Sequence, residues 1–319
     1  MPLRSVSSTP SLGSSQGIYL FGNDSVLGVL QALVERLNHN FSKQHCAPLP
    51  ICIIPSSNDL RGVRRWVAHQ ELLNLFDNDE SMQHWEAFAQ SVWAAQPVVA
   101  RLSQHYSDAY RQVQSSRRFC AFDGEFAQFI FCDAHGASTH GLDRLEEALI
   151  QLQTYEFVVN DWEHLKVKPA ALLDLSYVGA ALNWDEEQLR DRIHGASFFG
   201  SHAGLIGVAE RETLLQQLVE KDEIRWINPL SWWNDGALLN YITLRSGEQG
   251  SARSLYNFAR PSCTLAGVLD SLTSELGSGL KEDEHLGQRQ LNGDFLCNFL
   301  PEHLWAQRQA IEPAETQDA

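Results

Sequence analysis

The sequence predicts an α/β fold in which a mixed, mostly parallel sheet is flanked by helices. Two observations predict it. Short continuous apolar runs, rich in β-branched and aromatic residues, recur along the chain, as in strands that are buried on both faces. Each run is followed by a polar turn and then by apolar residues at helical spacing, which is the order of βα units. We expect one domain over residues 17–308.

The first two βα units lie in the N-terminal part of the chain. Residues 17–21, GIYLF, are expected to form a strand, and residues 25–38 carry apolar residues at helical spacing directly after it. Residues 49–55, LPICIIP, form a second apolar run, and a helix is expected through residues 60–70. The polar ends of these two strands are expected to lie close together.

The central part of the chain continues the same alternation. Strands are expected over residues 126–133, FAQFIFCD, and over residues 155–161, YEFVVND, with a helix over residues 141–153 between them. Several of these strands end in Asn or Asp. A further helix over residues 79–97 has an apolar stripe typical of core packing, formed by Trp85, Phe88, Ala89, Val92 and Trp93.

Composition excludes two classes of function. The chain of 319 residues has 40 Asp plus Glu against 24 Lys plus Arg, a formal net charge of −16, which repels phosphate backbones and anionic lipid surfaces. The short basic cluster at residues 61–66, RGVRRW, is more typical of a solvated helix face. The sequence therefore predicts neither nucleic-acid binding nor membrane-surface binding.

The two ends of the chain and its cysteines indicate where in the cell the protein is expected. Residues 1–16 are expected to form a disordered Ser-rich tail without the apolar core of a signal peptide, and residues 309–319 an acidic disordered tail. No apolar stretch approaches the roughly 18 to 20 residues of a membrane span. The six cysteines form no CxxC pair, which favours reduced thiols and a cytoplasmic protein.

Several segments together resemble a known family. Residues 120–149, CAFDGEFAQFIFCDAHGASTHGLDRLEEAL, resemble the central segment of nucleotide-sugar-dependent glycosyltransferases with the GT-A fold, where a strand leads into an Asp-X-Asp motif. GIYLFGND and PICIIPSSND resemble the first two strands of these enzymes. Residues 194–207 and 227–247 are similar to their later part, where an acidic residue opens a helix near the donor sugar. The likeness spans residues 17–260 and extends to bacterial sugar-transferase-like proteins.

The resemblance implies a single GT-A-like domain that transfers a sugar, as a hexosyltransferase, from a nucleotide-sugar donor to an unidentified acceptor. Asp235 stands where the resemblance places the acid nearest the anomeric carbon, so it is the expected catalytic residue and stabilises an oxocarbenium-like transition state. The residues expected to bind the nucleotide sugar are Asn23, Asp24, Ser56, Arg118, Asp133, Trp233 and Asn234.

The resemblance also implies a divalent cation, Mn, Mg or Zn, at Asp133 and His135. This sequence has Asp-Ala-His in place of Asp-X-Asp, and imidazole suits zinc better than magnesium. The C-terminal histidine of the family's metal site also has no match, since Cys297 and Asn298 stand at the expected position. Three alternatives follow: a zinc-like site, a metal-independent transferase, or a non-catalytic nucleotide-binding or partner-binding relative with a degenerate metal motif.

Ordinary structural roles compete with several of these assignments. Asp24 either contacts a base or ribose, or caps the helix that starts at Ser25. Arg118 pairs with a diphosphate, or with surface acids. Asp123 bonds a loop near the pocket or belongs to a turn, and Asp235 has an alternative as a helix N-cap.

Overall fold

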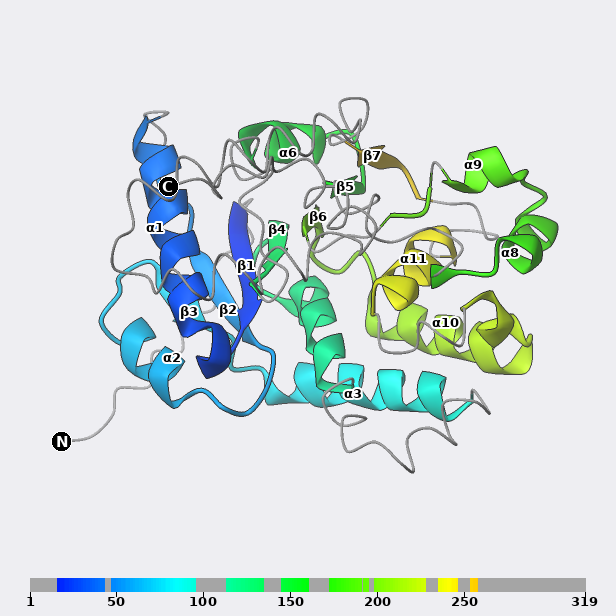
Figure 1. Cartoon of the computed structure of the whole chain (residues 1–319), viewed down its shortest axis with the longest axis horizontal. Helices are drawn as coiled ribbons and strands as arrows, with labels where there is room; N and C mark the ends of the chain where they lie inside the picture. The colour runs from blue at the N-terminus through cyan, green and yellow to red at the C-terminus, as the bar shows by residue number, and fades with distance from the viewer. Residues whose placement is uncertain are drawn as a thin grey trace, which may run out of the picture.

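The computed structural model describes residues 16–43, 47–95, 113–134, 145–160, 172–190, 192–194, 198–227, 235–245 and 253–257. A seven-stranded sheet in the order β3-β2-β1-β4-β6-β5-β7 runs through the molecule, with helices on both sides (Figure 1). The predicted fold class, a mixed and mostly parallel sheet flanked by helices, is confirmed.

The N-terminal half of the sheet is parallel throughout. The central strand β1 (Gln16–Gly22) pairs in parallel with β2 (Ile51–Pro55) on one side and with β4 (Gln128–Asp133) on the other. The short strand β3 (Leu73–Leu75) extends this half beyond β2. The strands β1, β2 and β4 therefore end at the same edge of the sheet.

The other half contains the one antiparallel strand of the described sheet. β6 (Phe198–His202) runs against both β4 and β5 (Phe157–Val159), and β7 (Leu255–Asn257) pairs in parallel with β5. Gly200 allows β6 to lie close to the side chains of β5 and β4, because a Cβ atom there would lie 2.6 Å from Val158 and 2.7 Å from Ile130. The β6 strand thus separates β4 from β5.

One face of the sheet is covered by three helices. α1 (Leu27–Lys43) follows β1 through a 3-10 turn, η1 (Asp24–Val26), and lies beside α2 (Arg61–Val67) in Figure 1. α6 (Leu145–Gln151) covers the neighbouring strands. Buried residues of these helices pack against the β1 and β4 side chains that point to this face: Ile18, Leu20, Ile130 and Cys132.

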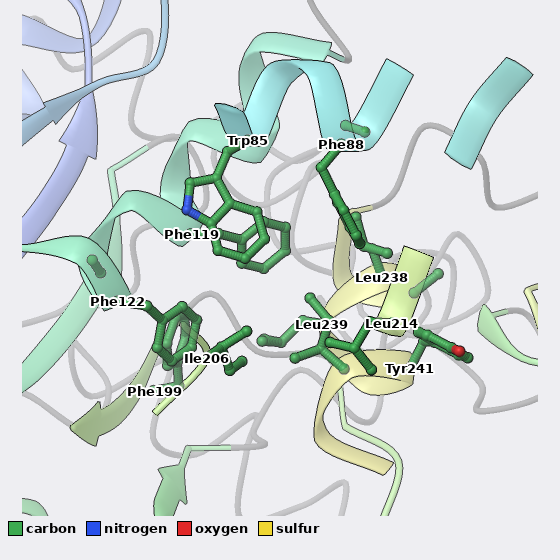
Figure 2. Packing of buried hydrophobic residues seen from close by; sticks show 14 of the residues in the cluster. Trp85, Phe88, Phe119, Phe122, Phe199, Ile206, Leu214, Leu238, Leu239 and Tyr241 are labelled. Atoms are coloured by element: carbon green, nitrogen blue, oxygen red, sulfur yellow. The ribbon is translucent and has the colours of Figure 1, made fainter. Parts of the chain in front are cut away.

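The opposite face carries the larger core. It is covered by α3 (Asp79–Ala94), the 3-10 segment η2 (Ser116–Asp123), α10 (Val208–Glu220) and α11 (Asp235–Arg245). Figure 2 shows how side chains from these elements meet: Trp85, Phe88, Phe119, Phe122, Leu214 and Leu238. The predicted apolar stripe of α3 is buried as expected.

Three smaller elements lie at the α10 end of the molecule. These are α8 (Leu175–Leu182), α9 (Glu186–Arg190) and η5 (Glu223–Trp226). Among the described helices none is both long and apolar enough to cross a bilayer. Of the six cysteines, Cys52, Cys120 and Cys132 lie in described segments, where they are buried and not joined in disulfides.

Candidate functional site

The candidate site lies at the edge of the sheet where β1, β2 and β4 end. The strand register aligns Gly22 of β1 with Pro55 of β2, and Phe21 of β1 with Asp133 of β4. Ligands of open α/β sheets bind beyond the carboxyl ends of parallel strands. The segments that follow these three strands are therefore the candidates for ligand contact at this edge.

The loops after β1 and β2 are bonded to each other. The Asn23 side-chain amide donates to Ser57 Oγ at 2.7 Å, and the Ser56 backbone N–H donates to the Gly22 carbonyl at 3.0 Å. The predicted closeness of these two polar strand ends is confirmed. Their polar residues line one continuous stretch of the sheet edge.

Asp24 has a role that neither sequence-based alternative described. Its two carboxylate oxygens accept hydrogen bonds from the backbone N–H groups of Gly62, at 2.6 Å, and Val63, at 2.8 Å, in the first turn of α2. Asp24 thus caps α2 across space, whereas Asn23 caps the turn that follows β1 by accepting from the Ser25 N–H at 3.0 Å. The carboxylate also complements the positive end of the α2 dipole.

Arg118 and Asp133 form an ion pair at the end of β4. Arg118 Nη2 donates to Asp133 Oδ2 at 2.7 Å, and each residue is only 7% exposed. The guanidinium lies 5.5 Å from the ring centre of Phe21 and 5.7 Å from that of Phe131. Both residues were expected at the nucleotide-sugar site, but their contact with each other was not predicted.

Arg117, which sequence analysis did not assign to the site, connects η2 to the neighbouring strand end. Its Nε donates to Glu86 at 2.5 Å, and its Nη2 donates to Asn58 at 2.9 Å in the turn after β2. The two consecutive arginines therefore reach two different strand ends. The doubled arginine directly before an aromatic segment was the only sequence signal for this arrangement.

The cation implied by the resemblance does not fit the described residues. A divalent ion at Asp133 needs a carboxylate oxygen that faces it, and this carboxylate already accepts a charged hydrogen bond from a buried guanidinium. His135 lies outside the described residues. Within the described segments no group of three or more His, Cys, Asp or Glu side chains is placed to hold a metal ion.

The expected catalytic region is described in part. Asp235 begins α11, as predicted for an acid that opens a helix, but its side chain, Trp233 and Asn234 lie outside what the structure describes. α11 is fixed by Asn240, which is fully buried. Its side chain accepts from the His194 N–H at 2.9 Å and donates to the His194 carbonyl at 2.5 Å.

Asp123 joins three elements rather than a turn. It accepts hydrogen bonds from Ser81 Oγ at 2.5 Å, from Trp85 Nε1 at 2.9 Å and from Arg211 Nη1 at 2.7 Å. These donors belong to α3 and α10. Asp123 therefore fixes the segment η2, which carries the two arginines, to α3 and α10.

Comparison with known proteins gives similarity of structure only. No family model and no curated protein sequence matches the chain. The chain is similar to mouse xyloside xylosyltransferase 1 in its apo form, with 11% identity over 76% of this chain and 84% of that chain and a TM-score of 0.45. It is also similar to core-mannan synthase A from Aspergillus fumigatus in an Mn/GDP form, with 9% identity over 72% and 71% of the two chains and a TM-score of 0.35.

A third similar structure is the apo form of WbbM, a bifunctional glycosyltransferase. Identity is 14%, the TM-score is 0.43, and the match covers 84% of this chain but 45% of WbbM. Because all three TM-scores are below 0.5, these likenesses do not assign a function to the chain.

Proposed function

We propose that this protein is a glycosyltransferase that binds a nucleotide-sugar donor at the shared end of β1, β2 and β4. The observation that supports it most is the direct bonding of the loops after β1 and β2, through Asn23 and Ser57, beside the Arg118–Asp133 pair at the end of β4. Three parallel strands thus present polar groups at one edge, where α/β folds bind nucleotides.

Within this proposal the residues have distinct tasks. Asn23 and Ser56 contact the base or ribose of a uridine or related nucleotide, and Asp24 holds the segment after β1 against α2. Arg118 and Asp133 lie at the donor diphosphate. Trp233 and Asn234, just before α11, contact the sugar, because an indole ring offers an apolar face for stacking and an amide offers both a donor and an acceptor.

Asp235 is the proposed catalytic residue. A carboxylate near the anomeric carbon stabilises the positive charge that develops on the sugar ring as its bond to the nucleotide breaks. The buried Asn240 side chain, which binds the His194 backbone, holds α11 and therefore the start of the helix at Asp235. A hexose is the proposed class of sugar.

Turnover of radiolabelled UDP- and GDP-hexoses to free or transferred sugar tests this function. Asp235→Asn is expected to lower kcat by about 10²-fold or more while the dissociation constant for the donor stays nearly unchanged. The matched control is Asp79→Asn, an exposed acid in the first turn of α3, which is expected to leave turnover unchanged. Equal turnover by the Asp235→Asn variant and the natural chain would refute the catalytic assignment.

A second candidate function is a non-catalytic nucleotide-binding or partner-binding module. It is favoured by one observation: the carboxylates of Asp24 and Asp133 both bind groups of the protein itself. Nucleotide binding without turnover of any hexose donor, under conditions that saturate the site, would select this second function.

A further inference from the structure

The Arg118–Asp133 pair lies at the position where the resemblance implies a metal. Asp133 is the last residue of β4, and its register partner on β1 is Phe21. The pair is closed by a hydrogen bond of 2.7 Å, and the Arg118 and Asp133 side chains are 8% and 10% exposed. A positive charge supplied by the chain itself therefore already stands against the carboxylate that would bind the cation.

The surroundings keep this ion pair together. Phe21 of β1 and Phe131 of β4 lie on the same face of the sheet, and the Arg118 guanidinium lies within 6 Å of both ring centres. Aromatic faces attract a cation, and an apolar environment makes a separated charge costly. The two rings and the low exposure of both side chains therefore favour the closed pair between Arg118 and Asp133.

A divalent ion at Asp133 would bring a second positive charge to a carboxylate whose Oδ2 atom already binds the buried Arg118 guanidinium. The two cations would repel each other in a setting that is largely shielded from water, with the guanidinium held near two phenylalanine rings. The intact pair has no net charge, so it does not repel a diphosphate as a lone carboxylate would. A nucleoside diphosphate can therefore approach this edge without a cation to offset Asp133.

We propose that Arg118 takes the place of the divalent cation as the counter-ion of Asp133, so that a nucleoside diphosphate binds this edge of the sheet without a metal. The inference rests on the proposed function, because it concerns the same donor site. In addition, the Arg118 side chain, and not a bound metal ion, neutralises the Asp133 carboxylate.

Calorimetric titration of the natural chain with UDP and with GDP tests the inference, once in EDTA and once in excess Mn²⁺. For the nucleotide that binds, the dissociation constants in the two buffers are expected to agree within about twofold. A dissociation constant at least ten times lower in Mn²⁺ than in EDTA would overturn the inference while the proposed donor site stands. If neither UDP nor GDP binds in either buffer, the proposed function is wrong, and this inference is wrong with it.

Variants of Arg117 and Arg118 test which of the two arginines makes nucleotide binding independent of Mn²⁺. In Arg118→Met the Asp133 carboxylate loses its counter-ion, so nucleotide affinity is expected to become at least tenfold higher in Mn²⁺ than in EDTA. Arg117→Met is the matched control, because Arg117 is equally buried but binds Glu86 and Asn58 instead, and its affinity is expected to stay independent of Mn²⁺.

Two results with these variants would contradict the role given to Arg118. One is an affinity of Arg118→Met that is the same in both buffers, and the other is a dependence on Mn²⁺ that Arg117→Met shares. Arg118→Lys, which keeps a positive charge at this position, is expected to bind the nucleotide without Mn²⁺. This variant provides the comparison if Arg118→Met does not fold, and a dependence on Mn²⁺ in Arg118→Lys would equally count against the inference.

Discussion

Asp123 ties the segment η2 to the helices α3 and α10. Its carboxylate accepts hydrogen bonds from Ser81, Trp85 and Arg211, and the Arg211 guanidinium lies 4.7 Å from the centre of the Trp85 ring. The Arg211 side chain is 7% exposed and that of Asp123 is 18% exposed. The pair is therefore largely shielded from water, and its loss leaves a buried positive charge.

Asp123→Asn is expected to lower the free energy of unfolding by about 3 kcal/mol, because Arg211 loses its charged partner in a buried setting. Urea denaturation followed by tryptophan fluorescence measures this loss. Glu186→Gln, which removes an exposed ion pair with Arg190, is the control and is expected to cost less than about 1 kcal/mol. Equal costs for the two variants would show that burial of the Asp123–Arg211 pair does not matter.

The positions of the site residues could be predicted from the sequence, but their partners could not. Asn23, Asp24 and Asp133 stand out in the sequence because they follow apolar strands, and the structure has them at the expected strand ends. Their partners are far away along the chain: Asp24 binds residues 38 and 39 positions later, and Asp133 binds a residue 15 positions earlier. Which residues pair in this way depends on how the elements pack in space. The local pattern of the sequence does not carry that information.

Among the elements, the strands that were predicted are the more apolar ones. The expected runs at residues 17–21, 49–55, 126–133 and 155–161 correspond to β1, β2, β4 and β5, which are buried almost throughout. β3 and β7 each contain an asparagine and are partly exposed, and β6 contains a glycine and a histidine. Strands interrupted by such residues lack the continuous apolar run by which the other four are recognised.

Asn240 is a fully buried polar side chain of α11 that bonds a segment outside the helix. Asn240 binds both backbone groups of His194 and also donates to the Gly236 carbonyl at 2.8 Å. Because Asn240 and His194 are 0% and 2% exposed, water does not replace these hydrogen bonds when they are lost. Asn240 therefore fixes the helix that begins at Asp235 to the segment before β6.

Asn240→Leu is expected to lower the free energy of unfolding by about 2–4 kcal/mol, since two buried backbone groups of His194 lose their side-chain partner. Chemical denaturation measures the change. Thr243→Val on the same helix is the control, because the Thr243 hydroxyl bonds only the Asn240 carbonyl within α11, and it is expected to cost less than about 1 kcal/mol. A smaller loss for Asn240→Leu than for Thr243→Val would contradict this account of α11.

For the molecule as a whole, the burial of ionisable side chains makes the free energy of unfolding depend on pH in the alkaline range. Burial raises the pKa of Cys120 from 9.0 to about 12, and it raises the pKa values of Cys52, Tyr19 and Tyr241 as well. Above pH 9 the unfolded chain loses these protons while the folded chain keeps them. The stabilising contribution is thus complete below pH 9 and declines as pH rises.

The free energy of unfolding is expected to fall between pH 9 and pH 12, by up to about 1.4 kcal/mol per pH unit for each such group. Urea denaturation at a series of pH values measures the slope. Tyr241→Phe removes one group and is expected to flatten the slope above pH 10, whatever its effect on stability at pH 7. An unfolding free energy that stays constant from pH 9 to pH 11 would contradict the burial of these side chains.

In the proposed function, the whole molecule holds a nucleotide-sugar donor where β1, β2 and β4 end. Hydrogen exchange of the natural chain, with and without saturating UDP- and GDP-hexoses in EDTA, measures this most directly. We predict slower exchange at residues 21–25, 56–59 and 133–134, with no change along the outer groove between α3 and α10 that Ser91, Leu215 and Val219 line. Exchange at the three strand ends that stays the same with every donor, or protection confined to that groove, would contradict the account.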